Sequence, residues 1–168
     1  MIHKLRIILD SKEDVFRDLE IHENQTLIDL HEGIKSAFEL EGNEMASFYL
    51  SNDDWYQGSE IPLENLSDEA DDVEVMEDVK IKQVISEKGN KMIYVYDFFN
   101  LWTFFVEVIE TDVISMNSEF PALVFSYGVR PELAPENDFK EILDFDIDFD
   151  LDNDDDFEED FFDESDMW

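Results

Sequence analysis

The sequence contains no cysteine, which excludes both disulfide bonds and thiolate metal sites. Glycine and proline are also scarce, with five and four residues. The five glycines form no phosphate-cradling loop. We therefore expect a protein that carries no cofactor.

Long apolar runs are absent too, since no stretch approaches the roughly 18 apolar residues that a membrane-spanning helix needs. The N-terminal sequence MIHKLRIILD places charge after only a few apolar residues, unlike a secretion signal. We expect a cytoplasmic protein that has no membrane partner.

Basic residues are few, with 11 Lys and Arg against 46 Asp and Glu, and the formal charge is −35. Such a charge repels nucleic acid and anionic lipid and attracts basic proteins or cations. The composition therefore predicts a basic protein partner, no direct nucleic-acid binding, and at most weak, nonspecific binding of divalent cations.

What the sequence does contain is apolar and aromatic material, at 43% and 14% of its residues. This is far more than a disordered polyanion carries, so a packed core is expected.

The charge is unevenly distributed. Residues 141–168 hold 15 acids and no base, while residues 1–140 hold 31 acids and 11 bases. Because the segment PELAPEN at 131–137 has the composition of a hinge, we predict a domain over 1–136 and a disordered acidic-aromatic tail over 137–168.

The body alternates between strand and helix patterns. Alternation of apolar and polar residues, or aromatic enrichment, predicts strands at 3–10, 15–21, 46–50, 91–98 and 101–110. A helix is predicted to begin at the N-cap Thr26, with Asp29 in its first turn, and to end at Gly42. Residues 67–78 read as an acidic loop that includes a short helix. This order predicts an α+β fold in which a mixed or antiparallel sheet packs on one main helix, similar to a β-grasp.

Side-chain periodicity also predicts the core of this fold. One helix face carries Leu27, Leu30, Ile34, Ala37 and Phe38 at spacings of three and four. In the aromatic hairpin, alternate residues are expected to close the core, namely Ile93 and Val95 with Trp102, Phe104, Val106 and Val108.

Three motifs resemble one known family. Residues 26–38 fit the pattern TLxDLHExIxxAF, residues 47–58 fit SFxxSNDxWxxG, and residues 94–102 are similar to YxYDFGDxW. In this order they resemble the plasmid pRiA4b ORF-3-like family. The resemblance implies an α+β domain of unestablished biochemical role, encoded near plasmid or mobile-element genes, and some relatives carry a resolvase label.

The chain departs from this family at several positions. Glu44 and Phe104 stand where the family has histidines, Phe99-Asn100 replaces its Gly-Asp turn, and its Gly/Cys-rich C-terminal stretch has no counterpart. Resolvase chemistry is also disfavoured, because it needs arginines around a nucleophile. The chain has only three arginines, none of them near a candidate serine.

Motif residues His31, Asp97 and Trp102 form the candidate site that the resemblance suggests. A metal site built from His3, His22 and His31 has no supporting spacing, so His31 is expected to pack or to hydrogen-bond locally. A buried Asp97 would suit acid–base chemistry, whereas the alternative is an aspartate that caps the turn beside Asn100.

The tail offers two further readings. From Asp148 to Glu159 its acids follow the spacing of an EF-hand, but Asn153 replaces the required glycine, so weak cation binding is expected. Its aromatic residues suggest anchors for a partner, while a purely solubilising tail remains the alternative. The candidate anchors are Phe157, Phe161, Phe162 and Trp168.

The sequence therefore predicts a non-catalytic interaction protein whose acidic tail binds a basic protein. Two alternatives stay open: a DNA mimic that inhibits a nucleic-acid-binding protein, and a hydrolytic enzyme that uses Asp97.

Overall fold

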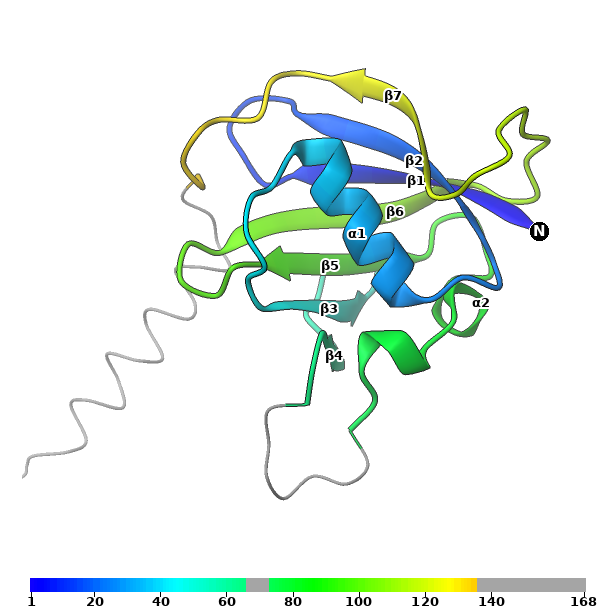
Figure 1. Ribbon diagram of the computed structural model, residues 1–168, viewed down its shortest axis with the longest axis horizontal. Coiled ribbons are helices and arrows are strands. Elements are labelled where there is room, and N and C mark those ends of the chain that lie inside the picture. The colour runs from blue at the N-terminus through cyan, green and yellow to red at the C-terminus, as the bar shows by residue number, and fades with distance from the viewer. Residues whose placement is uncertain (66–72, 136–168) are drawn as a thin grey trace, which may run out of the picture. The chain divides into compact units, whose positions relative to one another are not determined.

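The computed structural model describes residues 1–65 and 73–135, which belong to one unit, Met1–Pro135. These residues contain seven strands, two α-helices and a 3₁₀ turn (Figure 1). The elements in chain order are β1 (Ile2–Leu9), β2 (Phe16–His22), α1 (Leu27–Phe38), β3 (Ala46–Ser51), β4 (Glu60–Pro62), η1 (Met76–Asp78), α2 (Ile81–Val84), β5 (Lys91–Tyr96), β6 (Trp102–Glu110) and β7 (Ala122–Tyr127).

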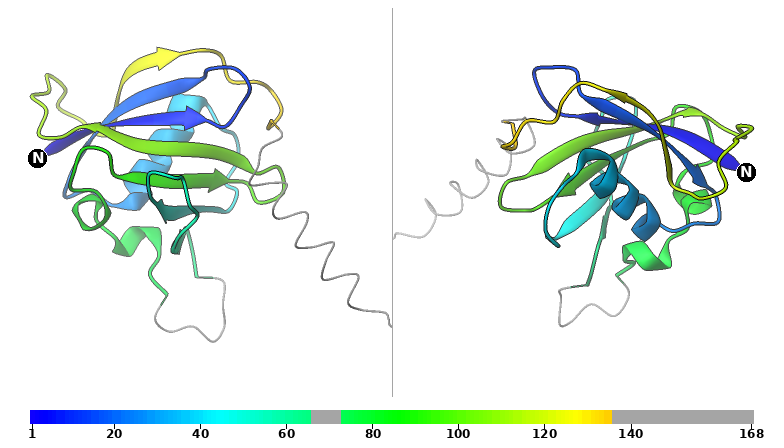
Figure 2. Two further views of the ribbon diagram at one scale, coloured as in Figure 1. Left: turned by 180° about the vertical axis from the view of Figure 1, so that it is seen from behind. Right: turned by 45° about the horizontal axis from the view of Figure 1, so that its top comes forward.

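The strands form one sheet in the order β4-β3-β5-β6-β1-β2-β7, and each pairing is antiparallel. Helix α1 lies across one face of this sheet, and Figure 2 shows the opposite face from behind. The predicted α+β fold, with an antiparallel sheet packed on one main helix, is confirmed. No helix in the described ranges is long and apolar enough to cross a membrane.

The first hairpin follows the predicted alternation. Leu5, Ile7 and Leu9 are buried in the core, whereas Lys4 and Arg6 between them are only partly buried. Because successive side chains of a strand point to opposite faces, the odd residues of β1 face α1 and the even residues face away.

Helix α1 begins as predicted and ends earlier than predicted. The backbone N–H of Thr26 donates to the carboxylate of Asp29 at 3.0 Å, which fixes the first turn. At the other end the cap is Glu39, three residues before Gly42, and its backbone is left-handed with φ 55°. The N–H groups of Leu40 and Glu39 donate back to Lys35 and Ser36, a Schellman motif that stops the helix at Phe38.

The hairpin of β5 and β6 has the predicted strands, but the predicted core face of β5 was wrong. Met92, Tyr94 and Tyr96 pair with the core residues of β6, while Ile93 and Val95 lie on the opposite face. Both sets are buried. Since the whole strand is apolar, a period of two did not reveal which set faces α1.

Candidate functional site

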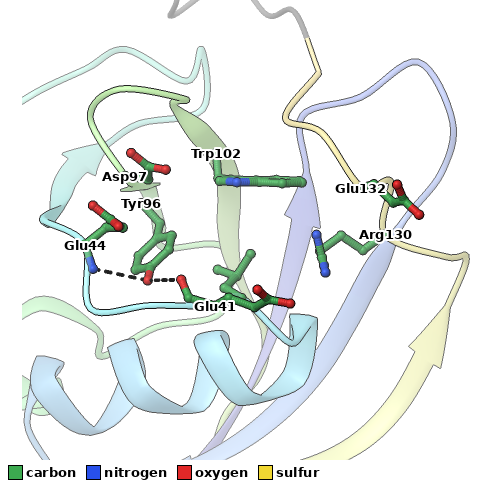
Figure 3. Close-up of a pocket in the computed structure, with 8 residues that line it drawn as sticks. Glu41, Glu44, Tyr96, Asp97, Trp102, Arg130 and Glu132 are labelled. Carbon is green, nitrogen blue, oxygen red and sulfur yellow. Dashed lines mark hydrogen bonds between the residues drawn. The ribbon is translucent and has the colours of Figure 1, made fainter.

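An acidic pocket lies where three loops meet at one end of the sheet. It has a volume of about 530 Å³ and is formed by the α1–β3 loop, the β5–β6 hairpin end and the segment after β7 (Figure 3). The residues that line it are Leu40, Glu41, Glu44, Tyr96, Asp97, Trp102, Arg130 and Glu132.

Asp97 caps the turn between β5 and β6. Its backbone is left-handed, with φ 65°, and its carboxylate accepts the backbone N–H groups of Phe99 and Asn100 at 3.1 and 3.3 Å. The side-chain amide of Asn100 donates to the second carboxylate oxygen at 2.7 Å. Both oxygens are therefore engaged by the turn, which is the capping alternative of the two that the sequence left open.

Tyr96 ties the α1–β3 loop to the sheet. Its hydroxyl lies 2.7 Å from the carbonyl oxygen of Glu41 and accepts the N–H of Glu44 at 3.2 Å (Figure 3). The carbonyl oxygen of Gly42 is 2.9 Å from the same hydroxyl. Burial raises the pKa of Tyr96, so the hydroxyl stays protonated near neutral pH and remains a donor. This bridge places Glu41 and Glu44 on the rim of the pocket.

Trp102 forms one wall of the pocket and carries a cation. The guanidinium carbon of Arg130 lies 5.2 Å from the centre of its ring, within the range of a cation–π contact. The Arg130 side chain also donates to the carbonyl oxygens of Pro131 at 3.0 Å and Glu39 at 3.3 Å. Arg130 thereby fastens the segment after β7 over an indole that is only 7% exposed.

The charge of the pocket is strongly negative. Four carboxylates line it against the single arginine, and Glu41, Glu44 and Glu132 are exposed. Several carboxylates that line one concave surface create a negative field, and this field attracts cations. The arrangement therefore suits an ammonium or guanidinium group.

His31, the third motif residue, lies elsewhere. It is buried on α1, and its Nδ1 is 2.6 Å from the hydroxyl of Tyr94. Burial lowers the pKa of His31 and raises the pKa of Tyr94, so both groups stay neutral. His31 borders a second cavity of about 350 Å³, which shares only Glu44 with the first.

The structure thus brings Asp97 and Trp102 together and leaves His31 in the local hydrogen-bonding role expected of it. Within residues 1–65 and 73–135, no group of three or more His, Asp or Glu side chains is placed to hold a metal ion. Glu41, Arg130 and Glu132 were not predicted, because only the sheet order brings their loops together. The four tail aromatics, the EF-hand spacing and the predicted tail itself lie outside the described residues.

Similarity to known proteins identifies the fold and the family of this chain. No curated protein is detectably similar to the chain. A solved structure, described as a protein of unknown function, MM3350 from Methanosarcina mazei Go1, matches 96% of this chain and 93% of its own chain. Its TM-score is 0.58 at 19% sequence identity, which shows a shared fold. The model of the plasmid pRiA4b ORF-3-like protein family matches residues 1–160, and the chain belongs to that family.

Proposed function

We propose that this protein binds a basic protein partner and acts through binding rather than catalysis. The observation that supports this most directly is the pocket at Trp102, in which four carboxylates face one arginine. It fits a lysine or arginine side chain, and Arg130 over Trp102 is an internal example of such a contact.

The placement of the basic residues supports the same proposal. Arg6 is paired with Asp18 at 2.9 Å, and Lys91 with Asp53 at 3.1 Å. Lys4 is paired likewise with Glu110 at 3.7 Å, so internal carboxylates engage part of the little positive charge that the chain has. Residues 1–140 carry 31 acids against 11 bases, so most carboxylates are left for an external cation.

In this proposal the tail contributes charge for encounter and aromatic side chains for residence. Charged rims mainly accelerate association, whereas buried aromatic anchors slow dissociation. The mobile-element context implied by the family makes a nucleic-acid-binding protein one class of basic partner.

The two alternatives make different demands. A DNA mimic would depend on the density of negative charge and not on any one pocket. A hydrolytic enzyme would need Asp97 as an acid or base, yet both of its carboxylate oxygens accept hydrogen bonds within its own turn.

A charge-matched pair of variants tests the proposal. The pocket variant is Glu41→Gln, Glu44→Gln and Glu132→Gln, and the control is Glu13→Gln, Glu87→Gln and Glu119→Gln. All six side chains are exposed, and both variants remove the same charge. The partner is captured with the full chain, identified by mass spectrometry, and titrated by calorimetry against each form.

We expect the pocket variant to weaken binding by about tenfold or more and the control to change it little, because local pairs contribute more than distant charge. Equal losses in both variants would favour the DNA mimic. Unchanged binding in both would contradict a charge-driven partner altogether.

A further inference from the structure

The edge strand β7 has an unusual surface for so acidic a protein. It pairs with β2 on its inner side, and no other described strand covers its outer side. Three of its side chains are apolar and half exposed: Leu123 at 50%, Phe125 at 49% and Tyr127 at 53%. An uncovered edge of this kind is a ready template for another strand.

Charge is missing from this edge. Residues 120–129, FPALVFSYGV, form the longest uncharged run in a chain in which 34% of residues are charged. Proteins ordinarily protect an edge strand with charged side chains, proline or a very short length. The opposite edge has all three devices, since β4 contains only Glu60, Ile61 and Pro62. The edge at β7 has none of these three within the strand, and its one irregularity is the register shift between the pairs Asp18–Phe125 and Leu19–Leu123.

The side chains of β7 are also held in place before any partner arrives. Phe16 of β2 stacks on Phe125 and Tyr127, with ring centres 5.8 and 5.4 Å apart. The guanidinium of Arg6 lies over Phe16 at 4.4 Å and is fixed by Asp18. Because Arg6 points away from α1, this aromatic cluster lies on the face of the sheet that α1 does not cover.

We infer that β7 pairs antiparallel with β7 of a second copy of this chain, about a two-fold axis beside Phe125. A basic partner would find no carboxylate on this strand, so the edge does not serve the binding proposed above. A second copy offers the same uncharged run, so two chains of charge −35 meet without placing carboxylates opposite one another along the strands. Such a contact is isologous and closes as a dimer.

The two proposals respond to salt in opposite directions. Binding of a basic partner should weaken as salt screens the attraction. Self-association should strengthen, because salt screens the repulsion between two acidic chains while leaving the apolar contact intact. Failure of one proposal is therefore distinguishable from failure of the other.

The first test measures the mass of the full chain by sedimentation over about a hundredfold concentration range, at about 0.1 M and 1 M salt. We expect a monomer–dimer equilibrium that shifts toward dimer at high salt. The variant Leu123→Lys with Phe125→Lys should stay monomeric. The control, Phe98→Lys with Phe99→Lys on the exposed β5–β6 turn, adds the same charge and should still dimerise.

A monomeric wild-type chain at every concentration would overturn the inference and leave β7 to an unrelated strand. Equal dimerisation of the β7 variant and the control would overturn it as well, since another surface would then be responsible. Circular dichroism confirms that each variant is folded.

Cross-linking gives a second test that does not depend on disruptive changes, and the absence of native cysteine makes it clean. In an antiparallel pair about a two-fold axis, a residue one position from the axis lies about 7 Å from the same residue of the other chain, which is twice the strand rise. Each further position adds about 7 Å. Phe125→Cys should therefore form a disulfide dimer, whereas Ala122→Cys, about 20 Å from its own copy, should not. Equal cross-linking at both positions, or at Ala122→Cys alone, would contradict the proposed axis.

Discussion

The pair of His31 and Tyr94 shows how one buried hydroxyl supports one buried ring. Tyr94 is fully buried, and its hydroxyl, 2.6 Å from Nδ1, gives that nitrogen its hydrogen bond. Tyr94→Phe removes the oxygen alone and leaves the nitrogen without this partner. We expect a loss of about 1–3 kcal/mol in the free energy of unfolding, measured by urea denaturation.

Tyr56→Phe is the matched control, because the Tyr56 side chain is 68% exposed and water replaces its hydroxyl contacts. An equal loss in both variants would mean that the buried pair contributes nothing specific to stability.

The same burial gives the protein a pH dependence. Burial is the main cause that lowers the pKa of His3 and of His31 from the ordinary value of 6.5, and the nearby charge of Lys35 adds to the shift at His31. The unfolded chain therefore binds protons more readily than the folded one. The contribution of the two neutral rings to the free energy of unfolding is therefore fully present above pH 6.5. It is lost as the pH falls below that value and through the lowered pKa values of the folded protein.

Urea midpoints measured between about pH 7.5 and pH 5 check this slope, above the range in which carboxylates ordinarily titrate. The variant His3→Gln with His31→Gln should have a flatter profile. The single variant His31→Gln keeps the buried His3 ring and should therefore retain part of the wild-type slope; a flat profile in the wild type would contradict the prediction.

Among the elements, α1 carries a correctable strain at its C-terminus. Glu39 adopts φ 55°, a conformation that glycine takes at no steric cost. It also adds a negative charge at the C-terminal end of the helix dipole, which the nearby Arg17 offsets only in part. Glu39→Gly should therefore stabilise the protein by about 0.5–1 kcal/mol, a rise of a few degrees in Tm.

Glu39→Ala separates the two causes, since it removes the carboxylate but keeps the Cβ atom. The Tm of Glu39→Gly should be higher than that of Glu39→Ala. If it is equal or lower, the left-handed backbone at this position costs little free energy.

The elements also show what sequence patterns can and cannot predict. The first hairpin, α1 and β6 were found because each buries one face and so alternates or repeats visibly, whereas β5 was found from its aromatic and apolar content. Strand β4 and helix α2 have three and four residues, too few for a period, and β7 has apolar residues on both faces of an exposed edge. None of these three was predicted.

The candidate site divides in the same way. Asp97 and Trp102 came from the family motifs, whereas Glu41, Arg130 and Glu132 belong to loops whose proximity is set by strand order. Only the three-dimensional structure joins residues separated by about ninety positions along the chain.

At the scale of the whole molecule, charge and aromatic anchors should separate kinetically in partner binding. Replacing Phe161, Phe162 and Trp168 by alanine keeps every charge, so the association rate should hold. Dissociation should become about tenfold faster or more, as lost aromatic anchors usually cause. Surface plasmon resonance with the captured partner measures both rates.

Ile114→Ala with Met116→Ala is the control, because both side chains are fully exposed on the loop before β7. Equal dissociation rates for the wild type and the tail variant would remove the anchoring role and leave charge as the contribution of the tail.

The central position of β1 has a consequence for how the chain is made. β1 is synthesised first, yet one of its two neighbours is β6, about a hundred residues later. On the ribosome, the β1–β2 hairpin and α1 must therefore wait with one edge of β1 open until β6 emerges. Such long-range closure slows folding, and stopped-flow tryptophan fluorescence should show a refolding phase in the millisecond-to-second range. During that wait the acidity of the nascent chain keeps neighbouring copies apart, so the charge that we propose to attract a partner to the finished protein also protects the unfinished one.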